Sequence, residues 1–147
     1  MVITHQFKCG ILERRMRCQS MYEIYKGSCH CGAVKFEVTA PQHLDLVRCN
    51  CSICHKSGFL HLIVPKSRFK LLQGKASLTT YRFGSMVAAH TFCIVCGVKP
   101  FYTPRSNPDG VDVNFYCLDS NSTFTVSDFD GQNWEKNAHT LAHKSRE

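Results

Sequence analysis

The chain has 147 residues, a length that suits one domain able to bury roughly two-thirds of its unfolded surface. Its 18 Lys and Arg against 11 Asp and Glu give a formal charge of +7, and no apolar run comes near the ~20 residues that span a bilayer. The composition therefore excludes a helical membrane protein. Ten cysteines are more than a domain of this size requires for stability, so their positions need a chemical explanation.

The first 20 residues, MVITHQFKCGILERRMRCQS, lack the apolar core of a signal peptide and carry Glu13 and three arginines where that core would lie. They contain one serine and an acid, which disfavours the alternative of a mitochondrial presequence. We therefore expect a cytoplasmic protein, with the nucleus as a second compartment. In a reducing environment, cysteine clusters usually hold metals rather than disulfides.

Eight segments are short, rich in β-branched and aromatic residues, and separated by Gly, Pro, Asn or Ser. In chain order they are residues 22–29, 33–40, 43–49, 59–65, 78–84, 87–93, 111–118 and 123–129. In the second segment Val34, Phe36 and Val38 alternate with charged residues, as in a strand with one buried face. Helix is expected only near residues 52–58 and 131–139. The pattern predicts one mainly β domain of short antiparallel strands.

The cysteines form three groups and three single residues. The groups CHC, CNCSIC and CIVC supply Cys29 and Cys31, then Cys49, Cys51 and Cys54, then Cys93 and Cys96. Zinc takes four ligands in a closed site, and a short spacing lets one turn present two sulfurs to one ion. Two pairs of cysteines together supply the four ligands of such a site, so that the group of three is left over. Cys9 and Cys18 are interpreted as bystanders, and Cys117 as a small apolar strand residue.

Two assignments of the four-ligand site are open: CHC with CIVC, or either pair with two members of the group of three. Gly32 and Gly97 follow the two pairs, and a glycine there suits the tight turn that brings backbone N–H groups close to thiolate sulfur. This similarity favours the two pairs as matching knuckles around one zinc ion. The group of three would then be a second zinc site with an open fourth position, as in catalytic zinc.

Three other interpretations compete with this one. A disulfide within CHC would close a strained small ring and fits poorly with a protein that is not secreted. A thioredoxin-like redox role for CIVC lacks a surrounding βαβ pattern. Two purely structural zinc ions are the stronger alternative, and His55 or His61 would then close the second site.

Four stretches carry a family resemblance: GSCHCGAVKFEV, CNCSICHKSG, HTFCIVCGVKPFYTPRSNPDG and NFYCLD. From about Tyr22 to Lys136 the chain resembles the glutathione-dependent formaldehyde-activating enzyme family. The stretches FYTPRSNPDG and FDGQNWEKN are similar to its eukaryotic branch, which includes centromere protein V. The resemblance implies a zinc domain at residues 22–136, an N-terminal extension at 1–21 and a C-terminal tail at 137–147.

The resemblance also implies an Mss4-like β-tent that holds two zinc ions. By motif position, the family's structural site falls on Cys29, Cys31, Cys93 and Cys96. Its catalytic site falls on Cys49, Cys51 and Cys54. Three thiolates around zinc make a modest Lewis acid, and a soft incoming thiol suits such a site better than water does. The implied activity is that of a carbon–sulfur lyase acting on glutathione, or a similar thiol, and formaldehyde or a related small electrophile.

Glutathione brings two carboxylates, for which Lys56, Lys99 and Arg105 are candidate partners beside the metal. Each of them is weighed against the simpler interpretation of a solvated surface charge. Asn114 and Asp119 are candidates for orienting a zinc ligand, although a structural role is preferred for both.

The rival function is a non-catalytic zinc-binding module of the centromere protein V type that binds chromatin or cytoskeleton. The charge of +7 and the pI near 9.0 support a nucleic-acid partner at first sight. If seven cysteines ionise to bind two zinc ions, however, the formal charge falls to +4. The basic residues are also scattered. We therefore expect weak or no binding to nucleic acid, no membrane partner and a small thiol as the main ligand.

Overall fold

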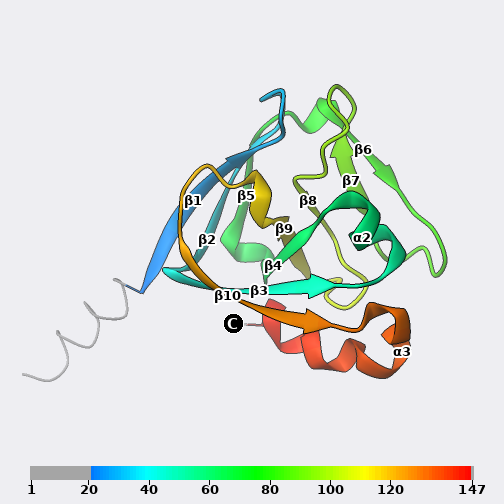
Figure 1. The fold of residues 1–147 in the computed structure, drawn as a ribbon. Helices are drawn as coiled ribbons and strands as arrows, with labels where there is room; N and C mark the ends of the chain where they lie inside the picture. The colour runs from blue at the N-terminus through cyan, green and yellow to red at the C-terminus, as the bar shows by residue number, and fades with distance from the viewer. Residues whose placement is uncertain (1–20, 147) are drawn as a thin grey trace, which may run out of the picture.

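The computed structural model describes residues 21–146, whose strands form two sheets and a two-stranded ribbon (Figure 1). One sheet has the order β1-β2-β5 and contains β1 (Tyr22–Ser28), β2 (Lys35–Pro41) and β5 (Phe69–Gln73). The other has the order β10-β3-β4-β9-β8 and contains β3 (His43–Cys49), β4 (Leu60–Pro65), β8 (Phe101–Tyr102), β9 (Gly110–Asn114) and β10 (Thr123–Phe129). The ribbon consists of β6 (Leu78–Tyr81) and β7 (His90–Cys93). The prediction of a mainly β domain is confirmed.

Helical structure is limited to short segments. They are α2 (Ser52–Ser57), α3 (Trp134–Asn137), the 3₁₀ helix η5 (Ala138–Ser145) and the single turns η1 (Lys66–Arg68), η2 (Lys75–Ser77), η3 (Phe115–Cys117) and η4 (Gly131–Asn133). Both regions predicted to be helical contain helix. α2 ends at Gly58, whose left-handed backbone (φ 60°) lets its N–H reach the carbonyls of Cys54 and His55. Within residues 21–146, no helix has the length and apolar character needed to cross a membrane.

The main core lies between the two sheets. Val34, Phe36 and Val38 are fully buried, as their alternation predicts. Phe36 stacks on Phe69 and meets Phe101 edge-on, with 5.6 Å between ring centroids in both pairs. Alternate residues of β3, β4 and β9 fill the opposite side of this core. Each large apolar side chain buried here stabilises the fold by roughly 1.5–3 kcal/mol.

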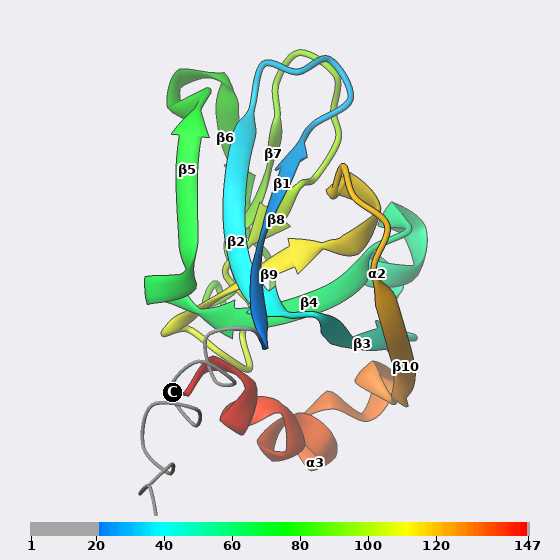
Figure 2. The same cartoon turned by 90° about the vertical axis from the view of Figure 1, so that its left-hand side faces the viewer.

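The other face of the five-stranded sheet carries polar residues as well as apolar ones. β4 is buried along its whole length. Because side chains alternate between the two faces of a strand, His61 and Ile63 point away from the main core. Asp112 lies opposite Ile63 on β9. The C-terminal helices α3 and η5 lie against this face (Figures 1 and 2), where Val47, Ile63 and Leu141 form a small second core. His61 and Asp112, which belong to the site described below, lie on this outer face.

Three details differ from the sequence-based expectations. β10 pairs with β3 in parallel, from Thr123 opposite His43 to Phe129 opposite Cys49, so the sheet is not wholly antiparallel. The strands β5 and β8 were not among the predicted segments, because one is a half-exposed strand and the other has only two residues. Residues 82–84 and 87–88, which were predicted to be strand, belong to a loop over residues 82–88, since Gly84 and Met86 turn the chain with positive φ.

Candidate metal centres and the adjoining pocket

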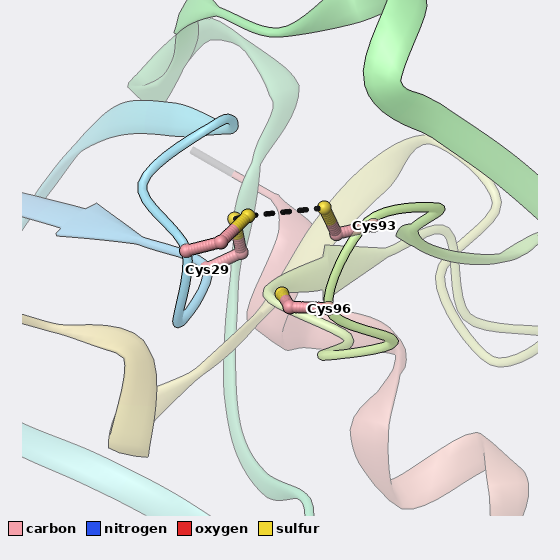
Figure 3. Close-up of side chains that lie close together, drawn as sticks. Cys29, Cys93 and Cys96 are labelled. Carbon is pink, nitrogen blue, oxygen red and sulfur yellow. Dashed lines mark hydrogen bonds between the residues drawn. The ribbon is translucent and has the colours of Figure 1, made fainter.

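The first metal-ligand cluster consists of the CHC and CIVC cysteines. The sulfurs of Cys29, Cys31, Cys93 and Cys96 all lie within 4.8 Å of one another. Cys31 is 3.6 Å from Cys29 and 3.8 Å from Cys93 between sulfurs. Figure 3 shows the side chains of Cys29, Cys93 and Cys96 close together. A tetrahedron with Zn–S bonds of ~2.3 Å has edges of about 3.8 Å, so this set fits zinc. All eight cysteines among the described residues are free thiols. Of the two assignments left open by the sequence, the structure brings the two pairs together.

The two turns of this cluster have matching backbones. Gly32 and Gly97 both adopt positive φ, 77° and 74°, and their N–H groups donate to the carbonyls of Cys29 and Cys93. The pKa of the Cys96 thiol is lowered to about 6, chiefly because the backbone N–H groups of Cys31 and Val98 donate to its sulfur. Backbone N–H groups that donate to the sulfur favour its thiolate form, which is the form that binds a metal ion.

The second cluster forms where β3 ends and α2 begins. Atoms of Cys49, Cys54 and His61 lie within 4.8 Å of one another. Cys51, the N-cap residue of α2, interacts with the sulfurs of Cys49 and Cys54 but lies outside this mutual set. Hydrogen bonds with the Cys49 and Cys54 thiols lower the pKa of Cys51, whereas hydrogen bonds with Cys49 and Cys51 raise the pKa of Cys54. The three predicted cysteines are therefore adjacent, and a histidine joins them.

His61 comes from the neighbouring strand β4 and is only 4% exposed. Its Nδ1 lies 2.6 Å from Oδ2 of Asp112, which is 1% exposed. Its Nε2 is buried and has no hydrogen-bond partner among the described residues. A bound metal would satisfy such a nitrogen, so the donor set fits zinc, with sulfur and imidazole ligands.

The turn that carries Cys49 and Cys51 is held by the segment after β10. The side-chain oxygen of Asn50 accepts from the backbone N–H of Gln132 at 3.0 Å, and its amide nitrogen donates to Asp130 at 3.0 Å. A Cβ added at Gly131 would lie 2.3 Å from the sulfur of Cys49. Only glycine allows this close approach of backbone to the thiol.

A cavity of about 910 Å³ opens over the second cluster. Its floor includes Val47, His61 and Asp112 from the outer sheet face, and the three cysteines border it. Its walls come from the loop around Phe83, from Tyr102 and from Trp134. None of the four cysteines of the first cluster lines this cavity. The two clusters thus differ in their surroundings: the first gathers four thiols away from the cavity, with Cys31 exposed, and the second borders the cavity.

The three predicted basic residues lie in different environments. Lys56 is exposed and lines the cavity. Arg105 also lines it, with its guanidinium carbon 3.7 Å from the Trp134 ring centroid and an ion pair to Glu135. Lys99 is buried at 9% exposure and is not among the lining residues.

The Lys99 ammonium is held inside the protein. It donates to Nδ1 of His90 at 2.7 Å and lies 3.7 Å from the ring centroid of Tyr102. Burial lowers the pKa of Lys99 to about 8, although the nearby thiols and Asp112 oppose this shift. Burial and the Lys99 charge lower the pKa of His90 to about 4, so the ring stays neutral and accepts the hydrogen bond. Lys99 is therefore a buried cation near the second cluster rather than a solvated surface charge.

The remaining polar residues lie in structural or exposed positions. Asn114 has the structural role preferred for it, since its amide donates to the carbonyl of Lys99 at 3.2 Å. Asp119 is exposed, and His55 is exposed and outside the second cluster. Asp112 was not singled out, although it shares the strand face of Asn114 two residues away. The N-terminal Cys9 and Cys18 lie outside the described residues.

A sequence profile of the family described as glutathione-dependent formaldehyde-activating enzyme matches residues 24–136. The chain belongs to this family. A protein from Halomonas elongata with a provisional name as such an enzyme is 53% identical over 35 residues, which cover 24% of the chain and 22% of that protein. The crystal structure of a Rhodobacter sphaeroides protein matches with a TM-score of 0.58 and 35% identity, over 68% of the chain and 99% of that protein. The chain thus aligns with about a fifth of the Halomonas protein and with nearly all of the Rhodobacter one.

Proposed function

We propose that the protein is a zinc-dependent enzyme of carbon–sulfur bond chemistry, which joins glutathione or a similar thiol to formaldehyde or a related small electrophile and reverses that step. The observation that carries the proposal is that the second cluster borders the cavity and the first does not. Cys49, Cys51 and Cys54 border a cavity large enough for a tripeptide thiol, whereas the other four cysteines close on one another. Family membership supports the same chemistry.

The proposed metal content is two zinc ions, one in each cluster. In the first, Cys29, Cys31, Cys93 and Cys96 are structural ligands. In the second, zinc would acidify an incoming thiol at neutral pH while leaving the sulfur electron-rich. The protein's part is to hold the thiol's sulfur against the electrophile and to exclude bulk water from that contact.

The bond changes of the proposed step balance without an oxidant. The sulfur lone pair forms the C–S bond, and the π electrons of the carbonyl move to its oxygen. That oxygen gains one proton, and the thiol has lost one. In the reverse direction the C–S bond breaks, the C=O bond forms again, and the thiol is released.

The cavity wall supplies a site for the carboxylates of the thiol substrate. The Arg105 guanidinium is oriented by its stacking on Trp134, and its ion-pair partner Glu135 is an exposed side chain that a substrate carboxylate would replace. Lys56 lies on the same cavity, at the end of α2. Buried Lys99 would not reach a ligand there; its charge instead offsets the negative charge of the thiolate-rich cluster.

The test is the rate of adduct formation from glutathione and formaldehyde, followed by NMR with the purified full chain. We expect the protein to accelerate formation and breakdown of the adduct, and Cys54→Ser to lose this acceleration while remaining folded. Cys117→Ser is the control, because Cys117 is buried but belongs to neither cluster. No acceleration by a fully zinc-loaded protein would contradict the enzyme proposal and favour the non-catalytic module of the centromere protein V type.

A further inference from the structure

The orientation of the His61 ring is fixed by two aromatic neighbours and by a buried carboxylate. Its ring centroid lies 4.8 Å from that of Phe59 and 6.1 Å from that of Tyr102, so aromatic rings pack against it from the segment before β4 and from β8. Its Nδ1 is held at 2.6 Å by the carboxylate of Asp112, which is itself buried. The ring therefore has one orientation, and Asp112 sets which nitrogen carries the proton.

The remaining nitrogen, Nε2, is buried and has no hydrogen-bond partner among residues 21–146. A buried polar atom without a hydrogen bond costs about 1–3 kcal/mol, and such atoms are rare in folded proteins. A ring nitrogen of His61 and the sulfurs of Cys49 and Cys54 all lie within 4.8 Å of one another. A carboxylate that fixes a histidine whose other nitrogen meets a metal is a recurrent arrangement in zinc sites.

Cys51 differs from its two neighbours in the cluster. It lies outside the mutual set that contains His61, Cys49 and Cys54. All three thiols border the cavity, Cys49 and Cys51 are half-buried, and Cys54 is 5% exposed. Of the three thiols, Cys51 is therefore the one whose departure leaves this mutual set intact.

We propose that His61, oriented by Asp112, is a zinc ligand of the second cluster together with Cys49 and Cys54, and that Cys51 is the ligand whose place an incoming thiol takes. The second half of this statement rests on the proposed function, whereas the first half does not. Three firmly held ligands would keep the metal in place during turnover. The exchange balances, since the incoming thiol loses the proton that the departing Cys51 sulfur gains, and the net charge of the cluster is unchanged.

The test for His61 is zinc-edge X-ray absorption on the zinc-loaded full chain without thiol. We expect the outer-shell scattering of an imidazole in the wild-type protein and in His55→Ala, which is the matched control because His55 is exposed and outside the cluster. His61→Ala should lose that signal. A wild-type spectrum without imidazole scattering would overturn the assignment, whether or not the variant folds.

Asp112→Asn provides a second measurement that keeps the side chain's shape. We expect its zinc affinity at the second cluster to fall about ten- to a hundredfold, with the first cluster unchanged, because the orienting carboxylate is lost. Unchanged affinity at both clusters would contradict the role given to Asp112.

The test for Cys51 is the same spectrum of Cys51→Ser with and without saturating glutathione. We expect this variant to keep both zinc ions and the imidazole signal, and to gain sulfur coordination when glutathione is added. Loss of the second zinc would show that Cys51 is a required ligand and overturn the exchange. If imidazole is present but glutathione changes neither the wild type nor the variant, the His61 assignment stands, whereas the exchange and the thiol-based function fail.

Discussion

The two cysteine clusters use the same chemical group for opposite purposes. The first takes all its ligands from two short turns with matching glycines, and it is tied into the main core through Cys29 and Cys93. The second takes its candidate ligands from the end of β3, from α2 and from the start of β4, and it borders a cavity. The first set thus depends on two local turns, whereas the second depends on how three elements meet at the edge of the cavity.

The surroundings of the clusters sharpen this contrast. Backbone N–H groups hold the thiols of the first cluster, and no titratable side chain other than cysteine belongs to it. The second cluster has Asp112 behind His61, and the buried ammonium of Lys99 nearby. The Lys99 ammonium offsets part of the negative charge of the nearby thiols and of Asp112.

The largest expected effect is on folding. Cys29→Ser should leave the chain largely unfolded, because a structural zinc site contributes about 10–16 kcal/mol and a typical domain is stable by only ~5–15 kcal/mol. Circular dichroism melts of the variant should lack a cooperative transition. Cys117→Ser, at a buried cysteine outside both clusters, should lower the melting temperature by only a few degrees. A folded Cys29→Ser protein would break the distinction between the clusters.

The second effect is loss of one metal without loss of the fold. Cys54→Ser should bind about half the zinc of the wild type and lose the acceleration of adduct formation, because a firmly held ligand of the open cluster is gone. Its thermal transition should remain cooperative. Metal analysis and melts on the same sample check this, and a fully unfolded variant would contradict the division between the clusters.

The first cluster could be predicted from the sequence, whereas the contact between His61 and Asp112 could not. Short cysteine spacings and the following glycines Gly32 and Gly97 predicted the first cluster, because both turns are local. The contact of His61 with Asp112 depends on the pairing of β4 with β9, between residues 51 positions apart. No local pattern specifies that pairing. His61 was therefore only an alternative ligand, and Asp112 went unnoticed.

The same limit explains the misplaced features of the fold. The parallel pairing of β10 with β3 depends on how the chain returns to the sheet edge, and a segment's own sequence does not encode the direction of its neighbour. The Lys99 ammonium packs against the rings of Phe59, the residue just before β4, and Tyr102 in β8, and these contacts bury it. In contrast, alternation in Val34, Phe36 and Val38 is local and was sufficient to identify their buried face.

A smaller effect should come from the close packing of the Gly131 backbone against the second cluster. Gly131→Ala would place a Cβ 2.3 Å from the sulfur of Cys49, so the loop must shift. We expect zinc affinity at the second cluster to fall about tenfold, since overpacking costs about 1–3 kcal/mol. Competition with a chelator measures this change, and the first cluster serves as the internal reference. Gln132→Ala is the matched control, because the backbone N–H that binds Asn50 remains. Equal zinc affinities in the two variants would contradict the close packing.

The smallest expected effect concerns the substrate. Arg105→Ala should raise KM for glutathione about tenfold with little change in kcat, because one charge-assisted hydrogen bond to a carboxylate is worth about 1.5–3 kcal/mol. KM for mercaptoethanol, which has no carboxylate, should not change. Arg48→Ala is the control, since Arg48 pairs with Asp128 on the surface and does not line the cavity. The same rise in KM for both thiols would rule out carboxylate binding by Arg105.

The difference between the clusters is tested most directly by the kinetics of zinc release to a chromogenic chelator, with and without glutathione. The account predicts two phases of equal amplitude: a fast one from the cluster at the cavity, whose rate changes with glutathione concentration, and a slow one that glutathione leaves unaffected. A single phase, or two phases that are both indifferent to glutathione, would contradict the account and make both clusters structural.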